Sequence, residues 1–282
     1  MKTTFSVLSL NMFGAPFHPK RVVRSFMRNN VRKRFDLIAE ELLRLSPDIV
    51  TLQEVYLFHT FRHLKKLLRD YPYVGYQRMF FGPRGGIVIF SKIPLEKTEY
   101  IDFKDRGQYT NKAITGQLTR KGVLLTKIKD LPLWILTTHL IQNSDYPWIE
   151  NIWNEQNKFS GLIQSQLDQT ASIVQTLTKT DMNVIITGDF NIPKRTNFYR
   201  HFIKDAGVID TFAKFNQPTY HKAFIPETAQ AERLDYIFYN SKGGVLKSSE
   251  QKHILENPVV VKTEEIYLSD HVGLMTTFTI EN

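Results

Sequence analysis

The stretch Thr187–Pro193 reads TGDFNIP and directly follows a short run of apolar, β-branched residues, Val184–Ile186. Such a run predicts a buried strand that delivers Asp189 at its end. Because a strand places residues i and i+2 on one face, we expect Asp189 and Asn191 to point at the same object. A carboxylate beside a carboxamide indicates a polar ligand, and the rest of the sequence indicates which kind.

The composition predicts one large domain. The 282 residues are 42% hydrophobic, which is enough for a sizeable buried core, and no Pro/Gly/Ser linker divides residues 1–282. The chain has no cysteine, which excludes disulfides, thiolate nucleophiles and Cys-ligated zinc. Its formal net charge of +9 indicates attraction to something anionic, such as nucleic acid, acidic lipid or a phosphorylated molecule.

The N-terminal sequence MKTTFSVLSLNMFGAP is a poor signal peptide, because its apolar run is short and no small-residue cleavage site is clear. No run of about 18 apolar residues predicts a transmembrane segment. We therefore expect a cytoplasmic or peripheral membrane protein. Secretion stays open, since a leader could have been removed.

Strand-like and helix-like segments are interspersed along the chain, which predicts an α/β architecture built in layers. Apolar residues recur at helical spacing from Val31 to Leu45 and from Ile163 to Leu177, and Phe61–Leu68 predicts a shorter helix. Strands are expected at Thr4–Leu10, Asp48–Leu52, Gly85–Phe90, Val123–Ile128, Trp134–Thr138, Val184–Thr187, Leu234–Tyr239 and Val272–Thr279.

Polar residues stand at or just beyond the ends of these strands. They are Asn11, Glu54, His139, Asp189, Asn191, Asp270, His271 and, within the strand RLDYIFY, Asp235. Any one of them alone is most simply a cap, a surface ion-pair partner or a core histidine, but a set of this chemistry is hard to attribute to caps. Asn, Glu and Asp oxygens suit a hard divalent cation such as Mg²⁺.

Other hydrolytic chemistries lack their sequence motifs. The histidines have no HExxH spacing, which argues against a zinc protease. The chain has no GxxxxGK[ST] loop, so it is not a P-loop nucleotidase. It has neither a GxSxG elbow nor a cysteine, so an acyl-enzyme mechanism is unsupported.

The pieces LNMFG, LQEV, GGIVIFSK, TTHL, GDFN, RLDYIFY and LSDH occur in an order that resembles the endonuclease/exonuclease/phosphatase superfamily, the deoxyribonuclease-I-like fold. The resemblance covers nearly the whole chain, and GDFN together with SDH is its most specific part. It implies a four-layer α/β sandwich of two packed mixed β-sheets flanked by helices. It also implies a metal-dependent phosphoric diester hydrolase that uses Mg²⁺, with Mn²⁺ as a substitute.

The resemblance also implies a metal site. Glu54 resembles the principal metal ligand of the superfamily, and Asn11 lies beside it. Asp270 is expected to approach the ion, directly or through water.

The resemblance further implies roles in catalysis. Asp189 resembles the carboxylate that orients or deprotonates the attacking water. His271 would face the scissile phosphate, with its ring fixed by Asp235. Asn191 and His139 resemble donors to phosphate oxygens. The substrate implied is a phosphodiester.

Local features separate the subfamilies. Inositol-polyphosphate 5-phosphatases are disfavoured because they carry a Cys-Asp-Arg motif where this chain has RLDY. Apurinic endonucleases are disfavoured because they lack the histidine of TTHL. The closest resemblance is to neutral sphingomyelinase-like phosphodiesterases, through LNMFG, YPY, GGIVIFSKIPL, LWILTTHL and LSDHVGLMTTF. Lys121 falls where these enzymes carry a lysine-containing segment. It is therefore a candidate phosphate contact, although a surface lysine at a turn is an equally simple interpretation.

We expect a sphingomyelinase-like phospholipase C that cleaves a phospholipid headgroup by in-line attack of water. The alternative is a Mg²⁺-dependent nuclease, endo- or exonuclease, on DNA or RNA, because a basic surface with interleaved aromatic residues also suits single-stranded nucleic acid. A choline-headed lipid is net neutral, so the positive charge of the protein would attract the anionic membrane surface rather than the substrate headgroup. The intact set of polar residues disfavours a non-catalytic scaffold.

Two segments favour peripheral contact with an anionic membrane. The segment after His139 carries Trp148 and Trp153, and aromatic residues with a polar edge suit a membrane interface. The basic stretch Lys20–Arg34 would add attraction to anionic lipid. The simpler interpretations are packing of the aromatic residues beneath a long loop and a solvated helical face.

Overall fold

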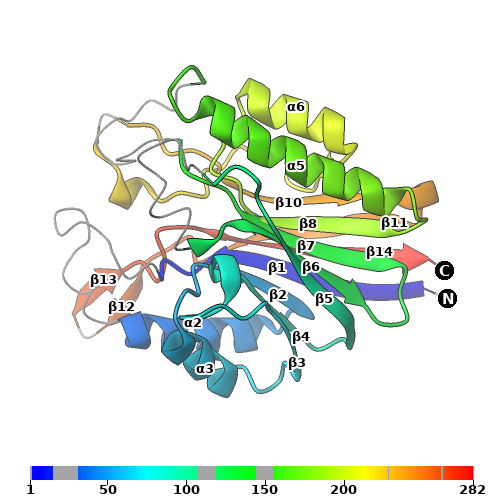
Figure 1. The fold of residues 1–282 in the computed structure, drawn as a ribbon. Coiled ribbons are helices and arrows are strands. Elements are labelled where there is room, and N and C mark those ends of the chain that lie inside the picture. Colours follow the sequence, from blue (N-terminus) through cyan, green and yellow to red (C-terminus); the bar gives the residue numbers. More distant parts are fainter. Residues whose placement is uncertain are drawn as a thin grey trace.

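The computed structural model describes residues 2–14, 31–106, 119–143, 155–227, 229–261 and 263–281. Two six-stranded β-sheets pack face to face, and helices cover the outer face of each sheet (Figure 1). This confirms the expected four-layer α/β sandwich. Trp148, Trp153 and residues 20–30 lie outside the described residues.

The first sheet has the strand order β11-β14-β1-β2-β4-β3. These strands are β11 (Leu246–Ile254), β14 (Gly273–Glu281), β1 (Lys2–Asn11), β2 (Ile49–Gln53), β4 (Val88–Ser91) and β3 (Tyr73–Gly75). Strand β1 is antiparallel to β14 and parallel to β2, in a register that sets Asn11 opposite Gln53. Because parallel neighbours end at the same edge of a sheet, Asn11 and Glu54 arrive there together.

The second sheet has the strand order β5-β6-β7-β8-β10-β9. These strands are β5 (Leu95–Asp102), β6 (Gly122–Ile128), β7 (Leu133–His139), β8 (Asn183–Asp189), β10 (Asp235–Asn240) and β9 (Ile209–Asp210). Parallel pairing sets His139 of β7 opposite Asp189 of β8, and antiparallel pairing sets Asp235 of β10 opposite the same residue. Three predicted site residues therefore form a row across this sheet.

Three apolar cores hold the layers together. Helices α2 (Val31–Leu45) and α3 (Phe58–Leu67) pack on the first sheet, and α5 (Ser160–Thr178) and α6 (Asn197–Ala206) pack on the second. The third core fills the space between the sheets. A separate hairpin is formed by β12 (Val259–Val261) and β13 (Glu264–Ile266). Among the described residues, no helix is both long enough and apolar enough to cross a bilayer.

Hydrogen bonds join the two sheets beneath the strand ends. Thr187 Oγ1 donates to Thr51 Oγ1 at 2.9 Å, and Gln53 Nε2 donates to Thr137 Oγ1 at 3.2 Å. All four side chains are fully buried. A buried polar group that loses its partner costs about 1–3 kcal/mol. These pairs therefore favour one placement of the two sheets over others.

The sequence patterns predict the strands that lead to polar residues and miss the edge strands β3, β5, β9 and β11. Strand β5 reads LEKTEYID and β11 reads LKSSEQKHI, so solvent-facing polar and charged residues interrupt the apolar pattern. The expected strand Gly85–Phe90 is wrong at its start. Gly85 and Gly86 form the short turn η1 (Arg84–Gly86) with φ of 67° and 69°, and the strand begins at Val88.

A buried ion pair anchors the start of β10, the strand that begins with Asp235. The guanidinium of Arg233 contacts the Asp210 carboxylate and donates to the carbonyl of Phe212 at 2.7 Å. Asp210 also accepts a hydrogen bond from the Tyr199 hydroxyl at 2.6 Å. Both charged side chains are almost completely buried.

Replacing Asp210 should destabilise the fold because it leaves the Arg233 guanidinium buried without a counter-charge. We expect Asp210→Asn to lower the free energy of unfolding by about 3 kcal/mol or more, measured by urea denaturation. The control Glu281→Gln removes an exposed pair with Lys247 at 3.7 Å and should cost less than about 1 kcal/mol. Equal small effects of the two changes would contradict this expectation.

Candidate active site

The candidate site lies at the end of the sandwich where β1, β2, β7 and β8 end, on the left in Figure 1. The structure brings together all eight polar residues that the sequence places at strand ends or in RLDYIFY. Seven of them are buried, and Glu54 is half-buried. Their roles in a reaction stay predictions, whereas their proximity is a property of the fold.

Asp189 is the centre of the site. Its Oδ2 accepts a hydrogen bond from Asn11 Nδ2 at 3.1 Å and lies 3.5 Å from His139 Nε2 and 3.7 Å from His271 Nε2. Its Oδ1 accepts from the backbone N–H of Asn191 at 2.9 Å. Burial raises the pKa of Asp189 to about 7, against the opposing charge of His271. A carboxylate with a pKa near neutrality is suited to accept a proton.

His271 is the charged histidine of the site. Its Nδ1 lies 2.7 Å from Asp235 Oδ2. Burial alone would lower the pKa of His271, but the carboxylates of Asp235, Asp189 and Asp270 raise it well above its ordinary value. The protonated ring donates Nδ1–H to Asp235 and turns Nε2–H toward Asp189. Tyr220 packs edge-on against this ring, with 5.0 Å between the centroids.

His139 is the neutral histidine. Burial, followed by the charges of Lys121 and His271, lowers the pKa of His139 well below its ordinary value. Its Nδ1 lies 3.5 Å from the Tyr56 hydroxyl. Lys121 is buried, and its Nζ donates to the carbonyls of His139 and Leu140 at 3.1 Å each. The ammonium therefore lies behind the end of β7, and its contact with a substrate phosphate stays a prediction.

The backbone turns into the left-handed region directly after β2 and β8. Glu54 has a φ of 64° and Asn191 a φ of 52°, which costs a non-glycine residue roughly 1–2 kcal/mol. The sequence interpretation expects strand geometry to align Asp189 with Asn191. Instead β8 ends at Asp189, Phe190 enters the core beneath α6, and the turn at Asn191 directs its N–H to the Asp189 carboxylate. Asn191 Nδ2 donates to the Leu140 carbonyl at 3.1 Å.

The side of the site formed by Glu54, Asp270 and Asn11 fits a divalent cation. Burial raises the pKa of Asp270 to about 6; His271 and Arg34 oppose this shift, and the Glu54 carboxylate adds to it. A cation would offset the repulsion between these two carboxylates. Asn11 turns its Nδ2 toward Glu54 Oε1, 3.4 Å away, while its Oδ1 accepts the N–H of Phe13. Binding an ion through Asn11 therefore requires its amide to rotate.

A second group of possible metal ligands overlaps the first. Asp189, Asp235 and His271 each place one ligand atom within 4.8 Å of the others. A histidine binds a metal only through an unprotonated nitrogen, and the carboxylates around His271 favour its protonated form. The donor chemistry therefore favours the Glu54 side.

Arg34 supports the site and is missed by the sequence interpretation. Its buried guanidinium donates to the carbonyls of Met12 at 3.2 Å, Phe13 at 2.7 Å and Leu268 at 2.6 Å. It thereby ties the segment after Asn11 to the segment before Asp270. Burial lowers the pKa of Arg34 to about 10, and the nearby Asp270 and Glu54 oppose that shift. Arg34 therefore keeps its charge at neutral pH.

The interpretation of Arg34 as part of a lipid-attracting basic stretch is wrong, because its charge is buried inside the fold. The position of Arg34 among the apolar residues of its helix indicates that it is buried. Arg34 lies three residues after Val31 and four before Ile38, on the apolar face of α2. Arg32 and Lys33 are exposed, as the basic stretch predicts.

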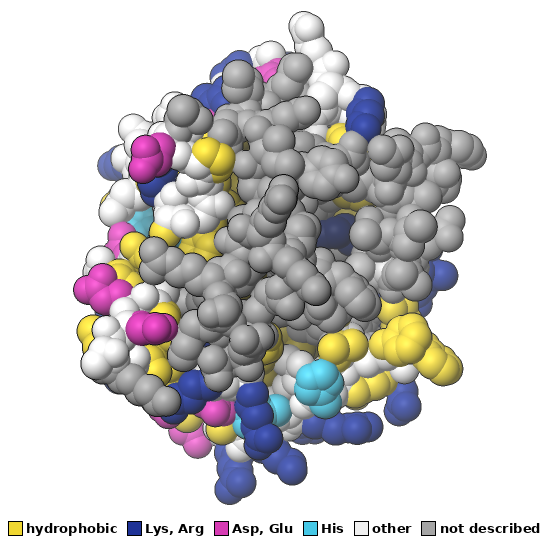
Figure 2. Space-filling view, turned by 90° about the vertical axis from the view of Figure 1, so that its left-hand side faces the viewer, with side chains coloured by type: hydrophobic (Ala, Val, Ile, Leu, Met, Phe, Trp, Pro, Cys, Tyr) yellow, Lys and Arg dark blue, Asp and Glu magenta, His cyan; other side chains and the backbone are white. Residues whose placement is uncertain are grey.

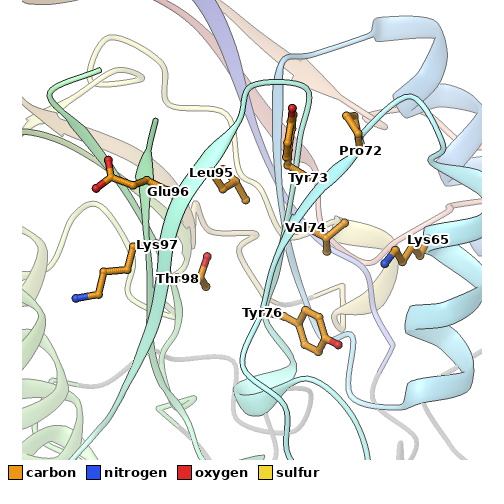
Figure 3. A pocket seen from close by; sticks show the side chains of 9 residues that line it. All are labelled: Lys65, Pro72, Tyr73, Val74, Tyr76, Leu95, Glu96, Lys97 and Thr98. Carbon is orange, nitrogen blue, oxygen red and sulfur yellow. The ribbon is translucent and has the colours of Figure 1, made fainter. Parts of the chain in front are cut away.

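A pocket of about 380 Å³ opens away from the site, between the edge strands β3 and β5 (Figure 3). Its walls include Tyr73, Tyr76, Leu95 and Lys97, and none of the predicted site residues lines it. The candidate site is therefore defined by its convergent polar groups rather than by this pocket.

The chain is similar to known sequences over most of its length. The sequence profile of the Endonuclease/Exonuclease/phosphatase family matches residues 8–271. A Caenorhabditis elegans protein named "Putative neutral sphingomyelinase" is 24% identical over 279 residues, which cover 88% of this chain and 62% of that protein. The chain thus spans about three fifths of that relative's length.

Two solved structures have a similar fold. Sphingomyelinase C from Streptomyces griseocarneus has a TM-score of 0.69 and 17% identity, over 98% of this chain and 99% of that chain. A humanized D. rerio TDP2 carrying 14 mutations has a TM-score of 0.67 and 19% identity, over 98% of each chain. At these identities the likeness shows the shared fold and does not decide between substrates.

Asp235→Asn should impair turnover because it removes the negative charge that keeps His271 protonated and oriented. We expect the rate of hydrolysis of a chromogenic phosphodiester to fall by about 10²–10⁴-fold. The matched control is Asp48→Asn, at the opposite end of β2, where the carboxylate accepts hydrogen bonds from Ser6. The control should keep the wild-type rate. A near-wild-type rate in Asp235→Asn would remove this pair from the proposed chemistry.

Proposed function

The chain belongs to the endonuclease/exonuclease/phosphatase family, whose members hydrolyse phosphodiester bonds, and on this premise we propose that it is a Mg²⁺-dependent, sphingomyelinase-like phospholipase C. In the proposed reaction, water attacks phosphorus in line, and the bond to the lipid oxygen breaks. Residues 1–282 would form one catalytic domain. The observation that carries the proposal is the Asp189 carboxylate surrounded by Asn11, His139 and His271.

Asp189 is the proposed acceptor for the proton of the attacking water. Its Oδ1 is held by the Asn191 N–H, while Oδ2 faces the groups that would surround a phosphate. Its raised pKa lets it gain a proton near neutral pH without becoming a permanently protonated acid. The position of Asp189 at the end of β8 keeps the carboxylate fixed before a substrate binds.

His271 and His139 are the proposed donors to the phosphate. The charged His271 offers Nε2–H to oxygens whose negative charge grows as water attacks. The neutral His139 offers a hydrogen bond without adding a charge. Asn191 and Lys121 would contribute further from the same edge of the second sheet. One of these N–H donors would give a proton to the lipid oxygen as it leaves.

Glu54, with Asp270 and Asn11 beside it, would hold the divalent ion. A bound Mg²⁺ supplies positive charge that polarises a phosphoryl oxygen, and Mn²⁺ accepts the same oxygen ligands. Arg34 supplies a fixed positive charge beneath the same carboxylates and orders the two segments that carry Asn11 and Asp270.

Sphingomyelin or a related choline lipid is the substrate class that the relatives support. The Caenorhabditis elegans relative and the Streptomyces structure are both named sphingomyelinases. Peripheral contact of the Trp148 and Trp153 segment with an anionic membrane belongs to this proposal. These two residues lie outside the described part of the chain.

A nuclease is the second candidate. The TDP2 structure is nearly as similar to this chain as the sphingomyelinase C structure, with TM-scores of 0.67 and 0.69. The net charge of +9 also suits a nucleic-acid substrate.

Removal of divalent ions should stop the reaction. We expect dialysis against EDTA to lower turnover of a chromogenic phosphodiester by roughly 100-fold or more, and Mg²⁺ or Mn²⁺ to restore it. Added Mg²⁺ should also raise the melting temperature of the wild type but not of Glu54→Gln, because ligands stabilise the state that binds them. The control variant Glu96→Gln should respond to Mg²⁺ like the wild type. Full activity after EDTA treatment would overturn the metal assignment.

A substrate panel separates the two candidate functions. With Mg²⁺, we expect release of phosphocholine from sphingomyelin or phosphatidylcholine liposomes, while single-stranded DNA and RNA stay intact. Asp189→Ala should abolish this release at a nearly unchanged melting temperature. Shortened nucleic acid beside untouched liposomes would instead establish the nuclease.

A further inference from the structure

Two phenylalanines project from the hairpin between β3 and β4. Phe80 is 85% exposed and Phe81 is 58% exposed, and Phe80 is the most exposed large hydrophobic residue in the described part of the chain. Exposed hydrophobic side chains stand at one edge of the face shown in Figure 2, close to Lys and Arg side chains. A hydrophobic pair held in water on a short turn requires an explanation.

The hairpin holds this pair in a fixed place. Arg78 bridges to Pro83, and the Met79 N–H donates to the Gly82 carbonyl at 2.9 Å, so Phe80 and Phe81 form the tip of a closed turn. Gly82 lies so close to the chain below that a Cβ there would be 2.1 Å from the Tyr56 carbonyl oxygen. The tip therefore rests directly on the backbone of Tyr56.

Two exposed arginines lie at the base of the tip. The guanidinium carbons of Arg62 and Arg78 lie 5.5 Å and 5.0 Å from the centre of the Phe58 ring, and both arginines are exposed. Phe58 also donates its backbone N–H to the Phe81 carbonyl at 2.9 Å. Residues 55–84 contain six Lys or Arg and a single acidic residue, Asp70, and one of the six, Arg84, is ion-paired with Asp102. The tip is thus hydrophobic, and exposed positively charged side chains lie at its base.

The tip is close to the candidate active site. Tyr56, whose backbone supports the tip, places its hydroxyl 3.5 Å from His139 Nδ1. A Cβ at Gly86 would lie 2.5 Å from the Tyr56 ring, so the hairpin and this ring are packed together. A surface that holds the tip would therefore also hold the active-site edge of the protein against it.

We propose that Phe80, Phe81, Arg62 and Arg78 form a docking surface for an anionic lipid membrane, an inference that rests on the proposed lipid substrate. The two rings would enter the boundary between headgroups and acyl chains, while the arginines contact anionic headgroups. None of these four residues belongs to the Trp148 and Trp153 segment, which lies outside the described residues. It would bring the site to the substrate at the bilayer surface.

The geometry of the rings favours lipid over nucleic acid. Phe80 and Phe81 pack edge to face, with 4.8 Å between centroids and an angle of 81° between the rings. Successive bases stack on aromatic faces that lie open side by side, which this arrangement does not provide. Two apolar rings at the tip of a turn instead present a compact wedge that a bilayer can bury.

The test measures binding of the full chain, in EDTA, to phosphatidylcholine vesicles with and without phosphatidylserine. We expect Phe80→Ala/Phe81→Ala to lower the partition coefficient roughly tenfold or more on both vesicles. Arg62→Gln/Arg78→Gln should lower it roughly tenfold at low salt on the anionic vesicles only. Phe80→Trp should keep wild-type binding, because tryptophan also partitions into the interface.

The control is Ile209→Ala, which removes another exposed hydrophobic side chain from β9, at the edge of the second sheet. It should bind vesicles like the wild type. All variants should hydrolyse a water-soluble chromogenic phosphodiester at the wild-type rate. Unchanged vesicle binding by Phe80→Ala/Phe81→Ala would overturn the proposal. Loss of single-stranded DNA binding with vesicle binding intact would assign the tip to nucleic acid instead.

The docking surface and the proposed function fail in different ways. If the wild type binds vesicles through the tip but releases no headgroup, the docking surface is supported and the lipid substrate is contradicted. If the wild type hydrolyses liposomes, and Phe80→Ala/Phe81→Ala binds them as well as the wild type does, the lipid substrate is supported and the docking surface is contradicted.

Discussion

A buried carboxylate joins the two sheets at the candidate site. Asp189 ends a strand of the second sheet, and its Oδ2 accepts a hydrogen bond from Asn11, which ends a strand of the first. A charge removed from water persists only where donors and opposite charges surround it. The strands, the turn at Asn191 and the two histidines supply those groups from four separate parts of the chain. The site therefore exists only when the whole sandwich is assembled.

The same burial produces opposite results in the two histidines. His271 lies against three carboxylates, and their charges outweigh the cost of burying a cation. His139 lies beside Lys121, whose charge acts in the same direction as burial. One imidazolium and one neutral imidazole thus flank Asp189 within 3.7 Å. Environment, rather than residue type, separates the pKa values of these two side chains.

The sequence predicts the strand ends well because apolar runs stop at the polar side chains. Asn11, His139 and Asp189 lie where those runs place them. The structure also explains why the motif GDFN begins with a glycine. A Cβ at Gly188 would lie 2.0 Å from the Thr138 carbonyl oxygen, so no larger residue fits there. The basic composition around Arg34 hides its burial, which only its spacing on the apolar face of α2 indicates. Its three carbonyl partners come from segments that local sequence does not connect. Edge strands escape detection for the related reason that solvent faces leave no apolar pattern.

The pairing of β1 with β14, from Lys2 opposite Glu281 to Ser9 opposite Leu274, has a consequence for biosynthesis. A ribosome adds about 5–20 residues per second, so β1 waits on the order of tens of seconds for that neighbour. During this interval one side of β1 is an unpaired template open to other chains, which makes shielding by a chaperone valuable. Because Asp270 and His271 directly precede β14, the candidate site also stays incomplete until that wait has ended.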